Sequence, residues 1–202
     1  MNFLAHALLS GNDPLVRAGN FVGDSVKGSQ LQHYPVAMQK GILLHRFIDS
    51  FTDTHSVVHE SKSLLRQRFG KYAGVVADVI YDHYLARNWD LHHDHLDLSS
   101  YAKETYSILQ TNFEQLPERS KEFLPYMIRQ DWLSSYKTRE GISLILLRMS
   151  KRTGFVSGME KAEEELEERD HIYEEHFSRF FPELRLASEL ELDRLNQLQW
   201  PE

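Results

Sequence analysis

Polar residues that could bind a metal ion recur at helical spacing between residues 45 and 53. His45, Asp49 and Asp53 are each four residues apart, and side chains at that spacing lie one above another on one face of a helix. Phenylalanine and isoleucine residues lie between them and could bury the same helix. The pattern predicts a helix that carries half of a metal site.

Two further clusters have the same chemistry. Asp82-His83 lies in the apolar run from residue 77 to 85, with Asp78 one helical turn earlier, and Asp24 follows an apolar segment directly after Gly23. Neutral imidazoles and carboxylates suit Mn²⁺, Mg²⁺, Fe²⁺ or Zn²⁺. Such an ion lowers the pKa of a bound water, so the clusters favour hydrolysis of a phosphoester.

A structural role would also explain these residues. A histidine and an aspartate four residues apart often form a surface ion pair or a helix cap, although a buried carboxylate needs a partner or a metal. His6, on the apolar face of residues 3–8, is either a core histidine or a ligand that a terminal helix brings to the site. Arg46 and Arg87 could bind a phosphate through their planar forks or neutralise nearby carboxylates.

The elements that must position these residues are all predicted to be helices. Apolar residues recur with the helical period and turn formers separate the segments, which predicts helices over residues 2–10, 15–26, 36–51, 55–69, 72–89, 101–116, 119–132, 139–150 and 160–181. Pro182 is expected to end the last helix, residues 90–100 to form a loop, and residues 154–158 to form a break. No segment has the alternation of a strand, so we predict an all-α, single-domain helical bundle over residues 1–202.

Local composition adds details to this prediction. Gly19 and Gly23 suggest a close backbone approach or a bend beside Asp24. The acidic block over residues 163–168 is interpreted as a solvated face, and Trp132 and Tyr136 as core residues.

Composition excludes several classes of function. A net charge of -7 and a pI near 5.9 argue against general nucleic-acid binding. The sequence has no cysteine, so it can form neither disulfides nor thiolate metal sites. The opening apolar run lacks a basic region and is too short to span a bilayer, which favours a soluble, cytoplasmic protein. The sequence also lacks the serine-hydrolase, P-loop and zinc-protease motifs.

The sequence resembles the acyl carrier protein phosphodiesterase family, whose members are also called acyl carrier protein hydrolases. The resemblance lies in four segments: the opening Met1-Asn2-Phe3-Leu4-Ala5-His6, then Gly19 to Asp24, Gly41 to Asp53, and Asp82 to Trp89. It is looser in residues 132–136 and 177–182. The family is a divergent relative of the all-helical, metal-dependent HD-domain phosphohydrolases, so the resemblance implies an HD-domain-like fold, although Asp82-His83 reverses the usual His-Asp order.

The resemblance implies hydrolysis of the phosphodiester that joins 4'-phosphopantetheine to a serine of holo-acyl carrier protein, with a divalent metal, typically Mn²⁺. We accordingly expect Asp24, His45, Asp82 and His83 as metal ligands. The expected catalytic residues are Arg46, Asp49, Asp53 and Arg87. Because acyl carrier proteins are acidic, we also predict a local basic patch of Lys27, Arg46, Lys62, Arg66 and Arg87 and a salt-sensitive KM.

Two alternatives stay open at the level of sequence. The first is a metal-dependent phosphohydrolase that acts on a nucleotide or another small phosphoester. The second is a noncatalytic helical protein that binds a carrier protein. The sequence gives neither the oligomeric state nor the identity of the metal.

Overall fold

The computed structural model describes residues 1–153 and 156–200, and this part of the chain contains helices and no strand. The prediction of an all-α protein is therefore confirmed. The α-helices are α1 (Phe3–Leu8), α2 (Pro14–Val22), α3 (Val36–Thr54), α4 (Ser56–Phe69), α5 (Ala73–Arg87), α6 (Leu98–Thr111), α7 (Glu118–Arg129), α8 (Trp132–Ser135), α9 (Arg139–Arg152) and α10 (Ala162–Gln197). Short 3-10 helices, including Gly23–Ser25 and Trp89–Leu91, lie between several of them.

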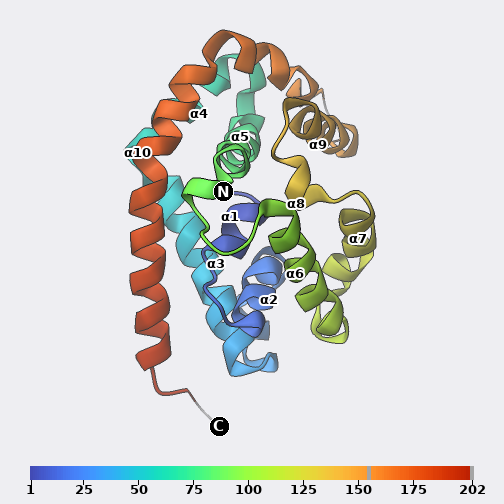
Figure 1. Cartoon of the computed structure of the whole chain (residues 1–202), viewed down its shortest axis with the longest axis vertical. Helices are drawn as coiled ribbons and strands as arrows, with labels where there is room; N and C mark the ends of the chain where they lie inside the picture. Colours follow the sequence, from blue (N-terminus) through green and yellow to red (C-terminus); the bar gives the residue numbers. More distant parts are fainter. Residues whose placement is uncertain (154–155, 201–202) are drawn as a thin grey trace.

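Helix α5 lies at the centre of the protein because it is apolar on nearly every side. Val76, Val79, Ile80, Tyr81 and Leu85 are all inaccessible to solvent, and a helix that is hydrophobic all round must be covered on every face. Figure 1 shows α10 along one edge of the molecule, α7 and α9 along the opposite edge, and α1, α3 and α5 between them. The core residues form one connected hydrophobic cluster.

Helices α2 and α3 pack closely because Gly19 lies at their contact. A Cβ atom at Gly19 would overlap the carbonyl oxygen of Met38, so only glycine allows this backbone approach. The sequence-based prediction of a close approach near Asp24 is thus confirmed. The contact fixes α3 beside the segment that carries Asp24.

The C-terminal helix differs from its prediction in length and in burial. Helix α10 continues through Pro182 to Gln197, because Phe180, Phe181 and Leu184 around the proline are buried and hold the helix on the core. Within the acidic block, Glu165 is fully buried and pairs with Arg169, so this block is not wholly a solvated face.

Other helices also begin or end at residues that differ from the predicted ones. Helix α6 begins at Leu98, inside the predicted loop, because the Asp97 side chain caps it by accepting a hydrogen bond from the Ser100 N–H. The short helix α8 had no counterpart among the predicted elements. Of the predicted break at 154–158, residues 154 and 155 lie outside the described part of the chain. Within the described ranges, no helix combines the length and the apolar character needed to cross a membrane.

Candidate metal centre

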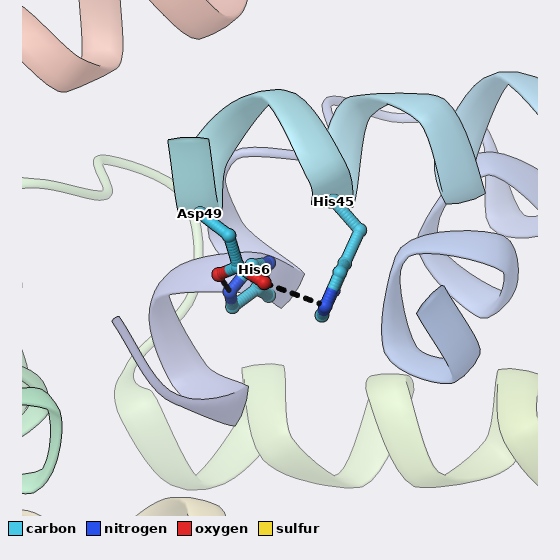
Figure 2. A group of neighbouring side chains, drawn as sticks. All are labelled: His6, His45 and Asp49. Carbon is cyan, nitrogen blue, oxygen red and sulfur yellow. Dashed lines mark ion pairs between the residues drawn. The ribbon is translucent and has the colours of Figure 1, made fainter. Parts of the chain in front are cut away.

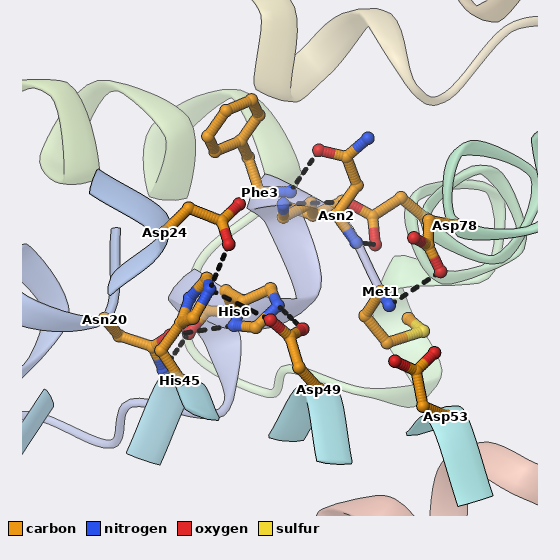
Figure 3. A network of polar contacts seen from close by, with 12 residues as sticks. Met1, Asn2, Phe3, His6, Asn20, Asp24, His45, Asp49, Asp53 and Asp78 are labelled. Atoms are coloured by element: carbon orange, nitrogen blue, oxygen red, sulfur yellow. Dashed lines mark hydrogen bonds and ion pairs between the residues drawn. The ribbon is translucent and has the colours of Figure 1, made fainter. Parts of the chain in front are cut away.

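Four side chains from three elements converge at the candidate site. Helix α1 supplies His6, the 3-10 helix Gly23–Ser25 supplies Asp24, and α3 supplies His45 and Asp49. The His45 Nε2 atom lies 3.2 Å from Asp24 Oδ1 and 3.1 Å from Asp49 Oδ2, and His6 Nε2 lies 3.2 Å from Asp49 Oδ1. Figure 2 shows His6, His45 and Asp49 pointing toward one another, and Figure 3 shows Asp24 beside them. We call these four residues the metal cluster.

The orientation of His6 is set by Asn20 on α2. The Asn20 Nδ2 group donates hydrogen bonds to the His6 carbonyl oxygen (3.0 Å) and to Ser10 Oγ (2.9 Å). Its Oδ1 atom therefore accepts from His6 Nδ1, at 2.8 Å. A donating Nδ1–H leaves the Nε2 lone pair free, and Nε2 is the atom that faces Asp49. The buried amide thus prepares His6 to bind a cation.

The position of His45 is fixed by Gly23 and by the two carboxylates. A Cβ atom at Gly23 would overlap the His45 ring, so the glycine leaves the space that the imidazole fills. The His45 side chain is 8% exposed, and neither ring nitrogen has a hydrogen bond of good geometry. A buried nitrogen without a well-aligned partner, placed between two carboxylates, fits a metal ligand.

The electrostatics of the metal cluster suit a cation. Burial disfavours the charged form of His45, but Asp24 and Asp49 outweigh burial and raise the pKa of His45 to about 9. Burial also opposes ionisation of Asp49, yet His45 and His6 hold the pKa of Asp49 well below its ordinary value. Burial lowers the pKa of His6, which keeps this imidazole neutral. The two carboxylates therefore favour a positive charge at the Nε2 atom of His45, where a proton is held. A divalent ion at this position can replace that proton.

The donor atoms are spaced closely enough to share one ion. One ligand atom from each of His6, His45 and Asp49 lies within 4.8 Å of the others, and Asp24 reaches the same His45 nitrogen. Two imidazoles and two carboxylates suit Mn²⁺, Fe²⁺ or Zn²⁺. The residues present therefore fit a divalent cation.

The metal cluster opens into a cavity of about 310 Å³, which we call the acidic cavity. Its lining includes Asp53 and Asp78 as well as the metal cluster, and an aromatic side formed by Phe3, Phe21 and Phe123. The exposed Arg119 of α7 also lines it. Among the described residues, no carboxylate forms an ion pair with Arg119, so its guanidinium is available to an anion.

The predicted ligand Asp82 does not lie in the metal cluster. It is inaccessible to solvent, and its two carboxylate oxygens accept hydrogen bonds from the backbone N–H groups of Asn2 (3.1 Å) and Leu4 (2.8 Å). These groups belong to the first turn of α1 and need such acceptors. Asp82 thus anchors the helix that carries His6.

The predicted ligand His83 also lies outside the metal cluster. Its Nδ1 atom is 2.7 Å from the carbonyl oxygen of Tyr136, between α5 and the residue after α8. The two neighbouring residues of the Asp82-His83 doublet point to different partners because consecutive side chains on a helix lie about 100° apart. Only Asp24 and His45 of the four expected ligands meet.

The predicted catalytic residues also divide into two groups. Asp49 belongs to the metal cluster, and Asp53 lies on the rim of the acidic cavity, where its Oδ1 accepts a hydrogen bond from Lys62 Nζ at 2.7 Å. Arg46 instead donates to the Val26 carbonyl oxygen. Arg87 is paired with Asp170 (3.2 Å) and Glu174 (2.6 Å). Neither arginine lines the acidic cavity.

The sequence predicts neither Asn20 nor Arg119 as a site residue. It leaves His6, on an apolar terminal helix, open between a core histidine and a metal ligand. Asn20 could have been identified from its position between Gly19 and Gly23. These glycines suggest a close backbone approach, and a polar residue buried there needs a hydrogen-bond partner. Arg119 gave no local signal, because only the tertiary fold brings α7 to residues 1–53.

We expect Asn20→Ala to weaken Mn²⁺ binding by roughly 10- to 100-fold, which is typical when a partner that orients a metal-binding histidine is lost. The reason is that His6 Nδ1 would lose its acceptor and the ring could turn away. Isothermal titration with Mn²⁺ would measure the change. Asn196→Ala, an amide-to-alanine change on α10, is the matched control, and equal affinity in all three proteins would contradict this role for Asn20.

We expect Mn²⁺ affinity to rise by about tenfold per pH unit up to about pH 9, because the ion must displace one proton from His45. The pKa of His6 is lowered, so His6 adds no competing proton. Titrations at pH 6, 7 and 8, in buffers of different ionisation enthalpy, would give both the affinity and the proton release. A flat affinity with no proton released would contradict ligation by His45.

The fold and the metal cluster together define an all-α protein with a two-histidine, two-carboxylate site suited to a divalent cation. Comparison with known proteins gives the family. The profile described as acyl carrier protein phosphodiesterase matches residues 1–184, and the chain belongs to this family.

Several curated relatives carry the same description. The chain is 30% identical over 184 residues to the acyl carrier protein phosphodiesterase of Pectobacterium atrosepticum, which covers 91% of this chain and 95% of the relative. It is 29% identical over 182 residues to that of Photorhabdus laumondii, with 90% and 92% covered. The protein of Salmonella agona is 28% identical over 184 residues, with 91% and 95% covered. No solved structure matches the chain, so the likeness to HD domains stays a prediction.

Proposed function

We propose that this protein hydrolyses the phosphodiester between 4'-phosphopantetheine and a serine of holo-acyl carrier protein, releasing the apo-protein. Membership of the family and the description of the relatives as acyl carrier protein phosphodiesterases support the proposal. The observation that carries it is the metal cluster at the wall of an open cavity. The expected cytoplasmic location belongs to the same proposal.

In this proposal His6, Asp24, His45 and Asp49 hold one divalent ion, with Mn²⁺ the first candidate and Mg²⁺, Fe²⁺ or Zn²⁺ the others. The bound ion stabilises negative charge on phosphoryl oxygens and lowers the pKa of water. The charge of the acidic cavity supports this dependence on metal. Asp53 and Asp78 are already paired with Lys62 and with the Met1 amino group, but Asp24 and Asp49 lie at the metal cluster, and without a cation they would repel the phosphodiester anion.

Two residues outside the metal cluster have roles in the chemistry. The Asp53 Oδ1 atom is held by Lys62, which leaves Oδ2 to accept the proton of the attacking water. The Arg119 guanidinium, on the same cavity, donates hydrogen bonds to the phosphoryl oxygens as negative charge develops. Arg119 therefore has the phosphate-binding role that the sequence suggested for Arg46 and Arg87.

The direct test is incubation of the purified protein with holo-acyl carrier protein and Mn²⁺, followed by intact mass measurement of the carrier. The proposal expects loss of the phosphopantetheine mass with metal and none with chelator. Conversion that continues in chelator would contradict dependence on metal. No mass change with any divalent ion would overturn the proposed reaction.

The same experiment separates the two alternatives. If small phosphodiesters or nucleotides are hydrolysed faster than holo-carrier, the protein is a phosphohydrolase of small substrates. If the carrier binds in stoichiometric amount without product, the protein is a binding protein.

A further inference from the structure

A second cavity adjoins the acidic cavity and has the opposite charge. This groove, of about 190 Å³, shares Asn2, Phe3, Arg119 and Phe123 with the acidic cavity. The remaining lining residues are Trp132, Tyr136, Ile145, Arg148, Met149 and Arg152. Three arginines and no carboxylate line it, although the whole chain has a net charge of -7. We call it the arginine groove.

The arginines of this groove have free guanidinium groups. In the described ranges 1–153 and 156–200, no carboxylate forms an ion pair with Arg119, Arg148 or Arg152. Arg87 and Arg169, by contrast, are held by acidic side chains of the same chain. Unpaired arginines gathered around one cavity favour an anionic partner from outside the molecule.

The surface around the groove has the composition of a protein-binding site. Leu144, Arg148 and Arg152 are four residues apart on α9, so they lie along one face of this helix. Leu144 is exposed, which adds an apolar contact beside the charges. Trp132 is half-buried and its ring is parallel to that of Phe123, with centroids 6.2 Å apart. Aromatic residues, methionine and arginine are the types enriched in protein interfaces.

We propose that the arginine groove and the adjoining face of α9 form the docking surface for an acidic protein, namely the carrier that presents the phosphodiester to the acidic cavity. The identity of that partner rests on the proposed function. Charge complementarity selects an acidic partner, and the shared residues place its phosphodiester at the metal cluster. The predicted patch of Lys27, Arg46, Lys62, Arg66 and Arg87 is not needed for docking, and Arg46 and Arg87 are already held within the chain.

The test compares two charge reversals of the same kind. Arg148→Glu combined with Arg152→Glu alters the docking surface, and Arg66→Glu combined with Lys27→Glu makes the same net change within the patch predicted from the sequence. We expect the first pair to raise KM for holo-acyl carrier protein by about tenfold or more at low salt, with little change in kcat. The control pair should change KM by less than about twofold. Hydrolysis of bis(p-nitrophenyl) phosphate with Mn²⁺ should be unchanged in both.

Binding of apo-acyl carrier protein, measured by biolayer interferometry, separates docking from the reaction. Loss of this binding only in the α9 variant supports the docking surface even if holo-carrier is not cleaved, in which case only the proposed reaction fails. Equal losses in both variants, unchanged binding in the α9 variant, or no binding by the unsubstituted protein would overturn the docking surface.

Discussion

Replacing Asp49 by asparagine is expected to lower kcat/KM for holo-acyl carrier protein on the order of 1,000-fold, the scale seen when a main electrostatic group of an active site is lost. Asp49 is the residue that touches both histidines, with Oδ1 toward His6 and Oδ2 toward His45. Asparagine keeps the shape of the side chain but removes its charge. Mn²⁺ content by elemental analysis and steady-state kinetics would measure the two losses together.

The fold should survive this substitution, because Asp49 is only half-buried and asparagine fills the same volume. A circular dichroism melt would verify this. Asp90→Asn is the matched control, since Asp90 is exposed and lies outside the acidic cavity. If the Asp49 variant kept both its metal and more than a tenth of its activity, Asp49 would not be a ligand.

Replacing Asp82 by alanine is expected to destabilise the protein by about 3 kcal/mol at pH 5, because two backbone N–H groups of the first turn of α1 would lose their acceptors. For a chain of this size the melting temperature should fall by roughly 10 °C. The folded fraction should still bind Mn²⁺, since the metal cluster does not include Asp82. This result would separate an anchoring role from the ligand role that the sequence suggested.

The loss of stability at Asp82 should depend on pH in a defined direction. Burial raises the pKa of Asp82 from 3.8 to about 7, against the opposing effects of the Met1 amino group and of the two backbone N–H groups. The native state therefore holds a proton on Asp82 that the unfolded chain releases at lower pH. The stability advantage of the unsubstituted protein over the alanine variant is full below about pH 4, declines as pH rises to about 7, and is constant above it.

Urea unfolding at pH 5 and at pH 8 would measure this dependence, with Asp193→Ala on the exposed face of α10 as the control. Two results would contradict the assignment. One is a variant of unchanged melting temperature that no longer binds metal, which would make Asp82 a ligand. The other is a stability difference that grows with pH.

The helical period predicted the fold class and most helices, because each helix buries an apolar face that is readable over a few turns. It failed where tertiary packing decides the outcome. Pro182 should end a helix by local rules, yet the buried Phe180 and Phe181 before it and the buried Leu184 after it hold α10 against the core. Glu165 resembled its solvated neighbours in sequence, and the approach of Arg68, Arg169 and the Tyr173 hydroxyl accounts for its burial.

Two metal-cluster residues, Asp24 and His45, were among the ligands that the resemblance implies, and Asp49 was expected as a catalytic residue. The spacing of His45 and Asp49 lies within one helix, so the sequence displays it directly. His6 and Asp24 come from separate elements, and the spacing of residues within one helix does not show that these elements meet α3. Asp82 carried the composition expected of a ligand, a carboxylate among apolar residues, but a buried carboxylate can equally accept hydrogen bonds from a helix start. Composition alone cannot separate these two uses.

The residues that we propose to hold the metal and those that we propose to face the partner come from different stretches of the chain. The four metal-cluster residues lie between positions 6 and 49, whereas Arg119, Arg148 and Arg152 lie on α7 and α9. A chimaera could therefore exchange α9 (Arg139–Arg152) for that of a relative and redirect the protein to another acidic carrier without changing Arg119 or any residue of the metal cluster. In such a protein, the relative would determine the choice of partner, and this chain would supply the metal cluster.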